Sequence, residues 1–203
     1  SPKDRNIYPL IGDAASITVI ERDPASAVIH ASLKTDGSRA EVLIIPAGGM
    51  RMPSTPETAK LENVGDNNLR AKDHVFMDGS AVFNFVQTEV PPLVEGLLQW
   101  AGVTKESVDY FLCHQPNRFM LEKLADKMKI PFAKMPNNVV ENFGNSGSVT
   151  IPTVMAFHLG ERLLREKFRV CLAGFGGGLT WGAMLLDLGN MSFNHTIEYK
   201  PKS

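Results

Sequence analysis

The sequence predicts an α/β fold in which a mixed sheet is covered by helices, and three observations lead to that prediction. An apolar run from Val108 to Cys113 ends abruptly in the polar residues 114–117. Two further polar stops that contain glycine follow, at 142–147 and at 174–178. Because helix starts and free backbone N–H groups lie outside the carboxyl ends of strands, such loops are where α/β proteins gather functional groups.

The first part of the chain is predicted to form strands and loops. Residues 17–21 and 27–33 are rich in β-branched and apolar side chains, which favours strands, and residues 42–45 are a short third candidate. Residues 46–68 contain three prolines and a Gly-Gly pair. They predict a long loop, and long loops inside compact domains are often functional.

From residue 78 the apolar side chains recur three or four positions apart, which predicts a helix. The pair Pro91-Pro92 predicts a break or a kink in it, and Gly102 ends it. A strand over 108–113 and a helix over 117–129 follow. Ser146 or Ser148 can cap a further helix through residue 164, and strands are expected over 169–173 and 179–188.

Composition excludes several classes of protein. Hydrophobic residues make up 43% of the 203 positions, enough for a sizeable core, and the formal net charge of −1 gives no case for nucleic acid as the main partner. No apolar run approaches the about 20 residues of a membrane span. Cys113 and Cys171 both lie in apolar runs, which predicts reduced, buried thiols in a cytoplasmic protein, and no cysteine or histidine spacing suggests a metal site. The start lacks a signal-peptide pattern and an initiator methionine, so we expect the sequence to begin in mid-protein, with processing or the way the protein was expressed as the alternatives.

His114 is the first candidate site residue. At the end of a strand it can act as a hydrogen-bond donor or general base, or it can be an ordinary hydrogen-bonded histidine. Its neighbour Cys113 suggests a Cys/His dyad at first sight. Successive strand side chains point to opposite faces, however, so Cys113 is expected in the core, and Cys171 likewise.

Two loops and one helix supply the other candidates. Asn145 can be a turn residue that caps the next helix, or an amide donor aimed at a substrate oxygen. The run Gly176-Gly-Gly178 can be a tight turn, or can bring backbone N–H groups close to an anionic oxygen, but it lacks the lysine of a nucleotide phosphate loop. The helix after His114 is basic, which predicts a solvated face or a docking surface for an acidic partner; its cations are Arg118, Lys123, Lys127, Lys129 and Lys134.

Taken in order, several stretches resemble the C-terminal half of the β-ketoacyl-acyl-carrier-protein synthase III family, in the thiolase-like superfamily. They are Ile11-Gly-Asp-Ala-Ala, Asp36-Gly-Ser, Met77-Asp-Gly-Ser-Ala-Val-Phe83, His114-Gln-Pro-Asn117, Phe143-Gly-Asn-Ser-Gly-Ser-Val-Thr-Ile-Pro152 and Gly174-Phe-Gly-Gly-Gly-Leu-Thr-Trp-Gly182. The resemblance implies a thiolase-like layered half-domain with a mixed five-stranded sheet over residues 1–188. Residues near 1–25 would be the end of the N-terminal half, and 189–203 a loose tail.

The resemblance also implies an activity, a decarboxylating Claisen condensation of acyl-CoA with malonyl-acyl-carrier protein that initiates fatty acid biosynthesis. In this family a cysteine accepts the acyl group, and a histidine and an asparagine hydrogen-bond the thioester carbonyl of the malonyl group while its enolate forms. His114 and Asn145 match these two positions, and Gly177 matches a backbone donor to the acyl oxyanion. Family members work as homodimers, and the resemblance implies no cofactor, only the two thioester substrates.

Further positions match the family's binding residues. Substrate-binding positions are Gly79, Phe83, Asn117, Phe175 and Gly176, and positions that bind the acyl carrier protein are Gln115, Pro116, Asn117, Arg118, Phe119 and Lys127. Common members have alanine in place of Pro116 and arginine in place of Phe119, so the carrier-protein contact is expected to differ or to move to Arg118.

The family's nucleophilic cysteine lies in the N-terminal half, and no residue here replaces it, so this chain alone is expected to be inactive. Three hypotheses follow from the sequence. The parent enzyme is a ketosynthase III, or a relative in secondary metabolism that transfers acyl groups without decarboxylation, or a non-catalytic partner subunit. Retention of His114 and Asn145 argues against the last.

Overall fold

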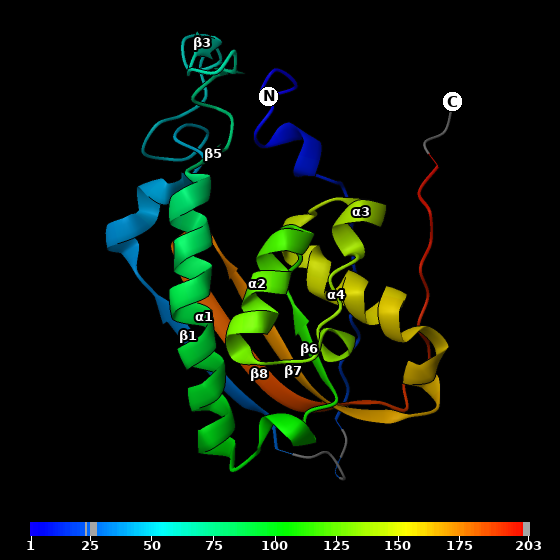
Figure 1. Cartoon of the computed structure of the whole chain (residues 1–203). Coiled ribbons are helices and arrows are strands. Elements are labelled where there is room, and N and C mark those ends of the chain that lie inside the picture. Colours follow the sequence, from blue (N-terminus) through cyan, green and yellow to red (C-terminus); the bar gives the residue numbers. More distant parts are fainter. Residues whose placement is uncertain (23, 25–27, 201–203) are drawn as a thin grey trace.

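A computed structural model describes residues 1–22, 24 and 28–200, and its centre is one mixed sheet (Figure 1). The strands lie in the order β1, β8, β7, β6; their bounds are His30–Thr35, Thr180–Gly189, Lys167–Gly176 and Tyr110–Cys113. Strand β7 pairs parallel with β6 and antiparallel with β8, and β8 pairs antiparallel with β1. The mixed α/β architecture predicted from the sequence is confirmed.

The expected fifth strand of this sheet is absent from the described residues. Residues 17–21 belong to no strand, and Ile17 and Ile20 are 89% and 88% exposed. Strands exist only as pairs, so β-branched residues alone do not make one. The candidate at 42–45 forms β2 (Leu43–Ile44), which pairs with β5 (Phe76–Met77) in a separate small sheet. The strand expected over 27–33 appears as β1, and residue 27 lies outside the described residues.

Helices cover both faces of the sheet and enclose two apolar clusters. Helices α1 (Gly79–Ala101) and α2 (Arg118–Met128) pack on the face that carries Phe111 of β6. Helices α3 (Val139–Phe143) and α4 (Thr150–Val154) pack on the face that carries Leu112. Adjacent residues of β6 therefore point into different clusters, as strand geometry requires. Short 3₁₀ turns are η1 Tyr8–Leu10, η2 Gly37–Val42, η3 Lys105–Ser107, η4 Phe132–Lys134, η5 Gly147–Val149 and η7 Gly160–Leu164, and η6 Met155–Leu159 is a π-helical turn.

Helix α1 runs unbroken through Pro91 and Pro92, so of the predicted break or kink the break is wrong. The Asp78 side chain caps its start by accepting from the Ala81 N–H at 2.9 Å, and Gly102 ends it in the left-handed conformation. Each proline removes one hydrogen bond from the helix. A continuous buried stripe on both sides of the prolines outweighs that loss; it comprises Val86, Val90, Pro91, Leu93, Val94, Leu97 and Leu98.

The single helix expected up to residue 164 is instead a series of short turns, η5, α4, η6 and η7. Gly147 and Gly160 have positive φ angles of 63° and 54°, which a right-handed helix cannot contain. The helix expected over 117–129 is confirmed as α2, capped by Asn117, whose Oδ1 accepts from the Met120 N–H at 2.8 Å. The cap fixes the end of the loop that joins β6 to α2 and carries His114.

The long loop at 46–68 belongs to a lobe at the top of Figure 1. It carries strand β3 (Glu62–Asn63), which pairs with β4 (Leu69–Arg70). The N-terminal residues attach to this lobe through a buried ion pair of 2.7 Å between Asp4 and Arg70. No helix among the described residues is long and apolar enough to cross a bilayer.

Candidate functional site

A pocket of about 70 Å³ lies where β6 and β7 end, and it gathers side chains from several loops. His114 directly follows β6, Gly176 ends β7, and Asn145 comes from the loop before η5. The remaining lining is largely apolar: Leu43, Met77, Val82, Phe85, Pro116, Met120, Phe175 and Leu179. The structure thus brings two distant polar residues, His114 and Asn145, to one small pocket at the carboxyl edge of the sheet.

His114 is held by backbone and side-chain contacts. Its N–H donates to the Ala173 carbonyl at 2.7 Å, which extends the pairing of β6 with β7 by one residue. Its ring Nδ1 lies 2.6 Å from Thr150 Oγ1, and the ring meets Phe175 edge-on at 5.3 Å between centroids. Burial lowers the pKa of His114 to about 4, so the imidazole is neutral at pH 7.

Asn145 is anchored through its backbone to the start of the chain. Its N–H donates to the Leu10 carbonyl at 2.6 Å, and its own carbonyl accepts from Gly12 N–H at 3.1 Å. The two segments meet this closely because Gly12 and Gly144 have no side chains: a Cβ on Gly144 would lie 2.8 Å from Gly12 Cα, and a Cβ on Gly12 would clash with the Phe143 carbonyl. The side-chain Oδ1 accepts from Gly147 N–H at 2.9 Å, which orients the amide and leaves Nδ2 as the donor.

Gln115 and Thr150 form hydrogen bonds that hold His114 and its loop in place. Gln115 is fully buried, and its Nε2 donates to the carbonyls of Cys113 and Pro136, both at 3.0 Å. Its backbone N–H donates to Thr150 Oγ1 at 3.2 Å. The Gln115 side chain of this chain is therefore not accessible to a partner protein. The sequence did not single out Thr150; its place three residues after Gly147, in the turn that follows Asn145, was the available signal.

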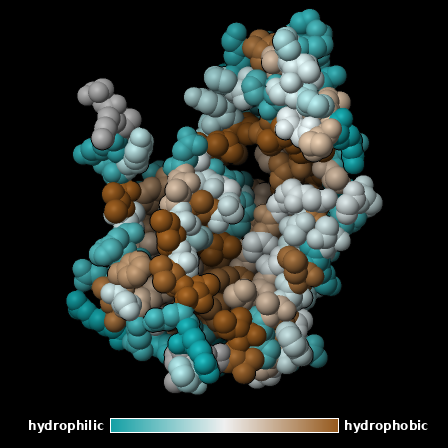
Figure 2. Space-filling view, turned by 180° about the vertical axis from the view of Figure 1, so that it is seen from behind, coloured by the Kyte–Doolittle hydropathy of each residue, from teal (hydrophilic) through white to brown (hydrophobic). Residues whose placement is uncertain are grey.

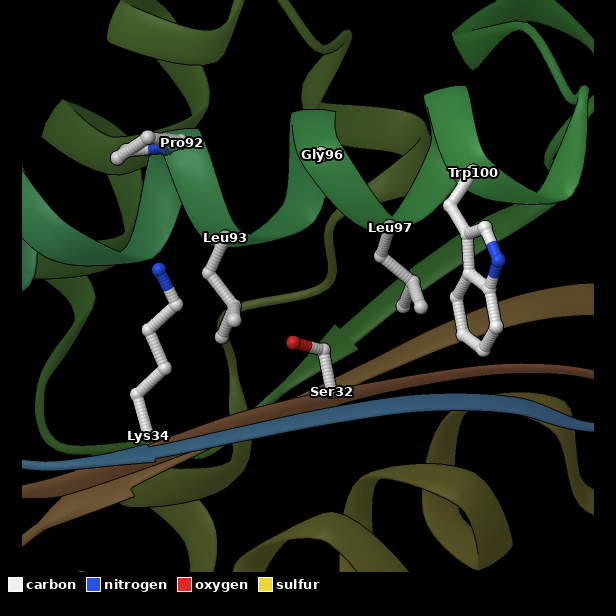
Figure 3. Close-up of a pocket in the computed structure, with 7 residues that line it drawn as sticks. All are labelled: Ser32, Lys34, Pro92, Leu93, Gly96, Leu97 and Trp100. Carbon is white, nitrogen blue, oxygen red and sulfur yellow. The ribbon is translucent and has the colours of Figure 1, made fainter.

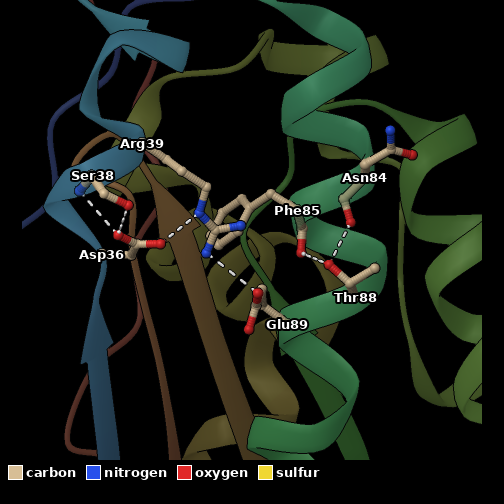
Figure 4. Close-up of polar contacts among 7 residues, drawn as sticks. All are labelled: Asp36, Ser38, Arg39, Asn84, Phe85, Thr88 and Glu89. Atoms are coloured by element: carbon tan, nitrogen blue, oxygen red, sulfur yellow. Dashed lines mark hydrogen bonds and ion pairs between the residues drawn. The ribbon is translucent and has the colours of Figure 1, made fainter.

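The glycine-rich turn is tied to the loop at Asp36. The backbones of Asp36 and Leu179 exchange two hydrogen bonds, of 2.8 and 3.0 Å. The Asp36 side chain also holds Arg39 at 2.7 Å, and Arg39 reaches Glu89 of α1 at 3.3 Å (Figure 4). The Arg39 guanidinium lies 5.5 Å from the Phe85 ring, which lines the pocket. This network connects the turn to α1.

The other predicted binding residues do not line the pocket; most lie at the start of α1 or α2, Lys127 lies in the last turn of α2, and Gly177 lies in the turn between β7 and β8. Phe83 and Phe119 stack with ring centroids 5.8 Å apart, and Phe119 is 60% exposed. Arg118 forms an ion pair with Glu141. Gly79, Gly177 and Lys127 are exposed, and Asn117 caps α2. Of the predicted residues, the pocket collects His114, Asn145, Pro116, Phe175 and Gly176.

Neither cysteine is placed for chemistry. Cys113 and Cys171 are both buried in the cluster beneath α1 and α2. Burial raises the pKa of Cys171 to about 12 and raises that of Cys113 further, so neither forms a thiolate at neutral pH. Within the described ranges no group of three or more His, Cys, Asp or Glu side chains could hold a metal ion.

A larger pocket of about 260 Å³ lies between β1 and the C-terminal half of α1 (Figure 3). Lys34 and Ser32 point into it from the strand, and Trp100 closes one side from the helix. It shares no residue with the pocket at His114. The face seen from behind also carries a band of apolar side chains around a hollow (Figure 2).

Comparison with known proteins gives matches along most of the chain. Residues 98–188 match the family model described as 3-oxoacyl-[acyl-carrier-protein (ACP)] synthase III C terminal. The β-ketoacyl-[acyl-carrier-protein] synthase III of Streptococcus uberis is 34% identical over 188 residues, which are 92% of this chain and 54% of the relative. That of Natranaerobius thermophilus is 33% identical over 189 residues, 91% of this chain and 54% of the relative.

Solved structures agree with the sequence matches. A crystal structure of a 3-oxoacyl-(acyl-carrier-protein) synthase III matches with a TM-score of 0.79 at 34% identity, and covers 92% of this chain and 56% of that one. A 3-oxoacyl-(acyl-carrier protein) synthase from Burkholderia xenovorans matches with a TM-score of 0.73 at 35% identity, over 84% of this chain and 47% of that one. The chain spans about half the length of the relatives it matches.

Proposed function

We propose that this chain, which corresponds to the C-terminal portion of the 3-oxoacyl-[acyl-carrier-protein] synthase III family, supplies the carbonyl-binding residues of a β-ketoacyl synthase. The full reaction would join an acyl group from acyl-CoA to malonyl-acyl-carrier protein with loss of carbon dioxide. It would initiate fatty acid synthesis, and the working enzyme would be a homodimer. Residues 1–188 would form the catalytic half-domain and 189–203 its tail.

The convergence of His114 and Asn145 on one pocket carries this proposal. When the malonyl carboxylate leaves as carbon dioxide, the electrons of the broken C–C bond delocalise onto the thioester carbonyl, and its oxygen becomes an enolate. An oriented amide N–H in a pocket with a largely apolar lining stabilises that charge strongly. Asn145 fits this role because Gly147 fixes its Oδ1 and leaves Nδ2 to donate.

The acyl oxyanion that forms in the condensation step would be held at the glycine-rich turn. Gly176 lines the pocket and Gly177 is exposed next to it, so backbone N–H groups are close at hand. A side chain at Gly177 would place its Cβ 3.2 Å from the Leu43 carbonyl, which keeps this position small. The ties between Asp36 and Leu179 would hold the turn still while charge develops.

The nucleophile would come from outside this sequence. Cys113 and Cys171 are buried with raised pKa values, so neither can take up an acyl group. The relatives are about twice as long as the matched region, and their remaining portion is where we expect the nucleophilic cysteine.

The acyl carrier protein would approach along α2. Arg118 is already paired with Glu141, whereas Phe119 is exposed and stacks on Phe83. We therefore expect an apolar contact at Phe119, with exposed Lys127 as an additional cation, and a pantetheine arm that passes Phe83 on its way to His114. Gln115 would act only by supporting the loop.

The complete product of the gene that encodes this chain tests the proposal. We expect its intact mass to increase by one acyl group after incubation with a short acyl-CoA, and carbon dioxide to be released when malonyl-carrier protein is added. Asn145→Ala should still be acylated but should release carbon dioxide about 100- to 1,000-fold more slowly, since one oxyanion donor is worth that much. The acyl group preferred would identify the primer.

Other outcomes would favour the remaining hypotheses. Acylation followed by transfer to an acceptor other than malonyl-carrier protein, without carbon dioxide, would indicate an acyltransferase of secondary metabolism. A gene product that never acylates would contradict the proposed function and indicate a partner subunit without catalytic activity or a diverged relative, and His114 and Asn145 would then need a different explanation.

A further inference from the structure

The hydroxyl of Thr150 lies at the centre of three short contacts. Its Oγ1 is 2.6 Å from His114 Nδ1, 3.2 Å from the Gln115 backbone nitrogen and 2.9 Å from the Gly147 carbonyl oxygen. A hydroxyl has one proton to donate and two lone pairs with which to accept. Three partners therefore use its full capacity, and their own chemistry determines which of them receives the proton.

Only one assignment satisfies all three contacts. The Gln115 N–H can only donate and the Gly147 carbonyl can only accept, so the hydroxyl accepts from the first and donates to the second. The contact with His114 Nδ1 must then use the remaining lone pair, which requires a proton on Nδ1. In the opposite assignment the hydroxyl donates to Nδ1, and two oxygens face each other at 2.9 Å without a proton between them.

The two ring nitrogens of His114 have different surroundings. Nδ1 lies beside the Thr150 hydroxyl, whose proton goes to the Gly147 carbonyl. The other nitrogen, Nε2, forms no hydrogen bond within the described part of the chain, and the ring lines the pocket.

We propose that Thr150 is a positioning residue that holds His114 as the Nδ1–H tautomer, so that Nε2 presents a lone pair to the pocket. Gly147 completes the arrangement through both of its peptide groups, because its N–H fixes Asn145 and its carbonyl receives the Thr150 proton. The pocket therefore offers an amide donor at Asn145 and an acceptor at His114, rather than two equal donors.

This inference rests on the proposed function only where it assigns roles toward a substrate. A neutral Nδ1–H imidazole cannot donate to a thioester carbonyl. It can accept a proton from an S–H, O–H or N–H group that enters the pocket, and it can donate from Nε2 only after that. Asn145 would then be the side-chain donor to the enolate oxygen, and His114 would act first as a general base.

The tautomer can be measured without any activity. The ¹⁵N shifts of the ring nitrogens distinguish protonated from unprotonated sites, and long-range ¹H–¹⁵N spectra of the labelled 203-residue chain at pH 7 would show its five histidines. His114→Gln identifies the signals of His114 by their loss. We expect Nδ1 to be protonated and Nε2 unprotonated. A proton on Nε2 in the unmodified chain would overturn the proposal.

Two variants test the part played by Thr150. Thr150→Ser keeps the hydroxyl and should preserve the Nδ1–H tautomer. Thr150→Val keeps the shape but removes the hydroxyl, and should give a mixture of the two tautomers. A pure Nδ1–H ring in Thr150→Val would refute the role of Thr150. If that variant does not fold, the unmodified chain still decides the tautomer. A wrong tautomer with normal acylation and carbon dioxide release would leave the proposed function intact.

Discussion

Strands β7 and β8 and the segment 16–22 show that β-branched side chains do not decide where a strand forms: the segment has four such residues, and each strand has only one. The two strands exchange backbone hydrogen bonds from Lys167–Gly189 at one end to Gly176–Thr180 at the other, and β8 also pairs with β1. Residues 16–22 pair with no described strand, and Ile17, Val19 and Ile20 are exposed. The difference shows that a strand is decided by the presence of a partner and not by the side chains of the segment.

The largest expected effect sharpens this comparison. Phe111→Ala removes a buried ring from the cluster beneath α1 and α2, and should lower the free energy of unfolding by about 3–5 kcal/mol. Ile20→Ala removes an exposed side chain and should change it by no more than about 0.5 kcal/mol. Urea unfolding of both variants gives the two values. A large loss in Ile20→Ala would mean that the segment packs against something in solution.

Much of the fold was predictable because local patterns coincide with tertiary contacts. The turn-bounded strands at 108–113, 169–173 and 179–188 were found, and so was α2 with its cap at Asn117. The helix break at Pro91 was mispredicted because the helix is stabilised by the burial of its whole apolar stripe. A rule that considers only the residues next to a proline does not include that burial. Thr150 was missed because its importance lies in contacts with residues up to 36 positions away.

The buried site should also make the stability of the chain depend on pH. Burial lowers the pKa of His114 from 6.5 to about 4, and it also lowers that of His158. Between pH 6.5 and about pH 4, His114 binds more protons in the unfolded chain than in the folded one. Its contribution to the free energy of unfolding is therefore fully present above about pH 6.5 and is lost as the pH drops toward 4. His114 should contribute roughly 2–3 kcal/mol of this loss.

His114→Gln provides the control for the pH dependence. Urea unfolding at several pH values should show a shallower decline in this variant, because glutamine does not titrate. An equally steep decline would assign the effect to other groups.

A smaller effect tests the contact between the N-terminal region and the loop that carries Asn145. Residue Ile11 forms a bridge with Asn145, and Gly144, with a φ of 70°, allows the close approach. Gly144→Ala should lower the free energy of unfolding by about 1–3 kcal/mol through strain and the clash with Gly12.

Gly96→Ala is the matched control for that substitution. A Cβ at Gly96 meets nothing within 4 Å, and the residue lies inside α1. This change should stabilise the chain by about 0.5–1 kcal/mol, because alanine loses less backbone entropy than glycine. A similar loss in both variants would show that the approach of Gly12 to Gly144 has no special importance.

The pairing of β1 with β8 also has a consequence for how the chain reaches its fold. His30 pairs with Leu185, so the edge strand β1 can pair only with β8, which lies much later in the sequence. During synthesis on a ribosome, β1 emerges long before β8 exists, and its apolar residues stay unpaired for that interval. The β7–β8 hairpin needs only a short turn and can form first, after which β1 closes the longest loop in the sheet. Completion of the sheet is therefore a late step in the folding of each newly made chain. Before that step the chain exposes the most unpaired strand for chaperones to bind.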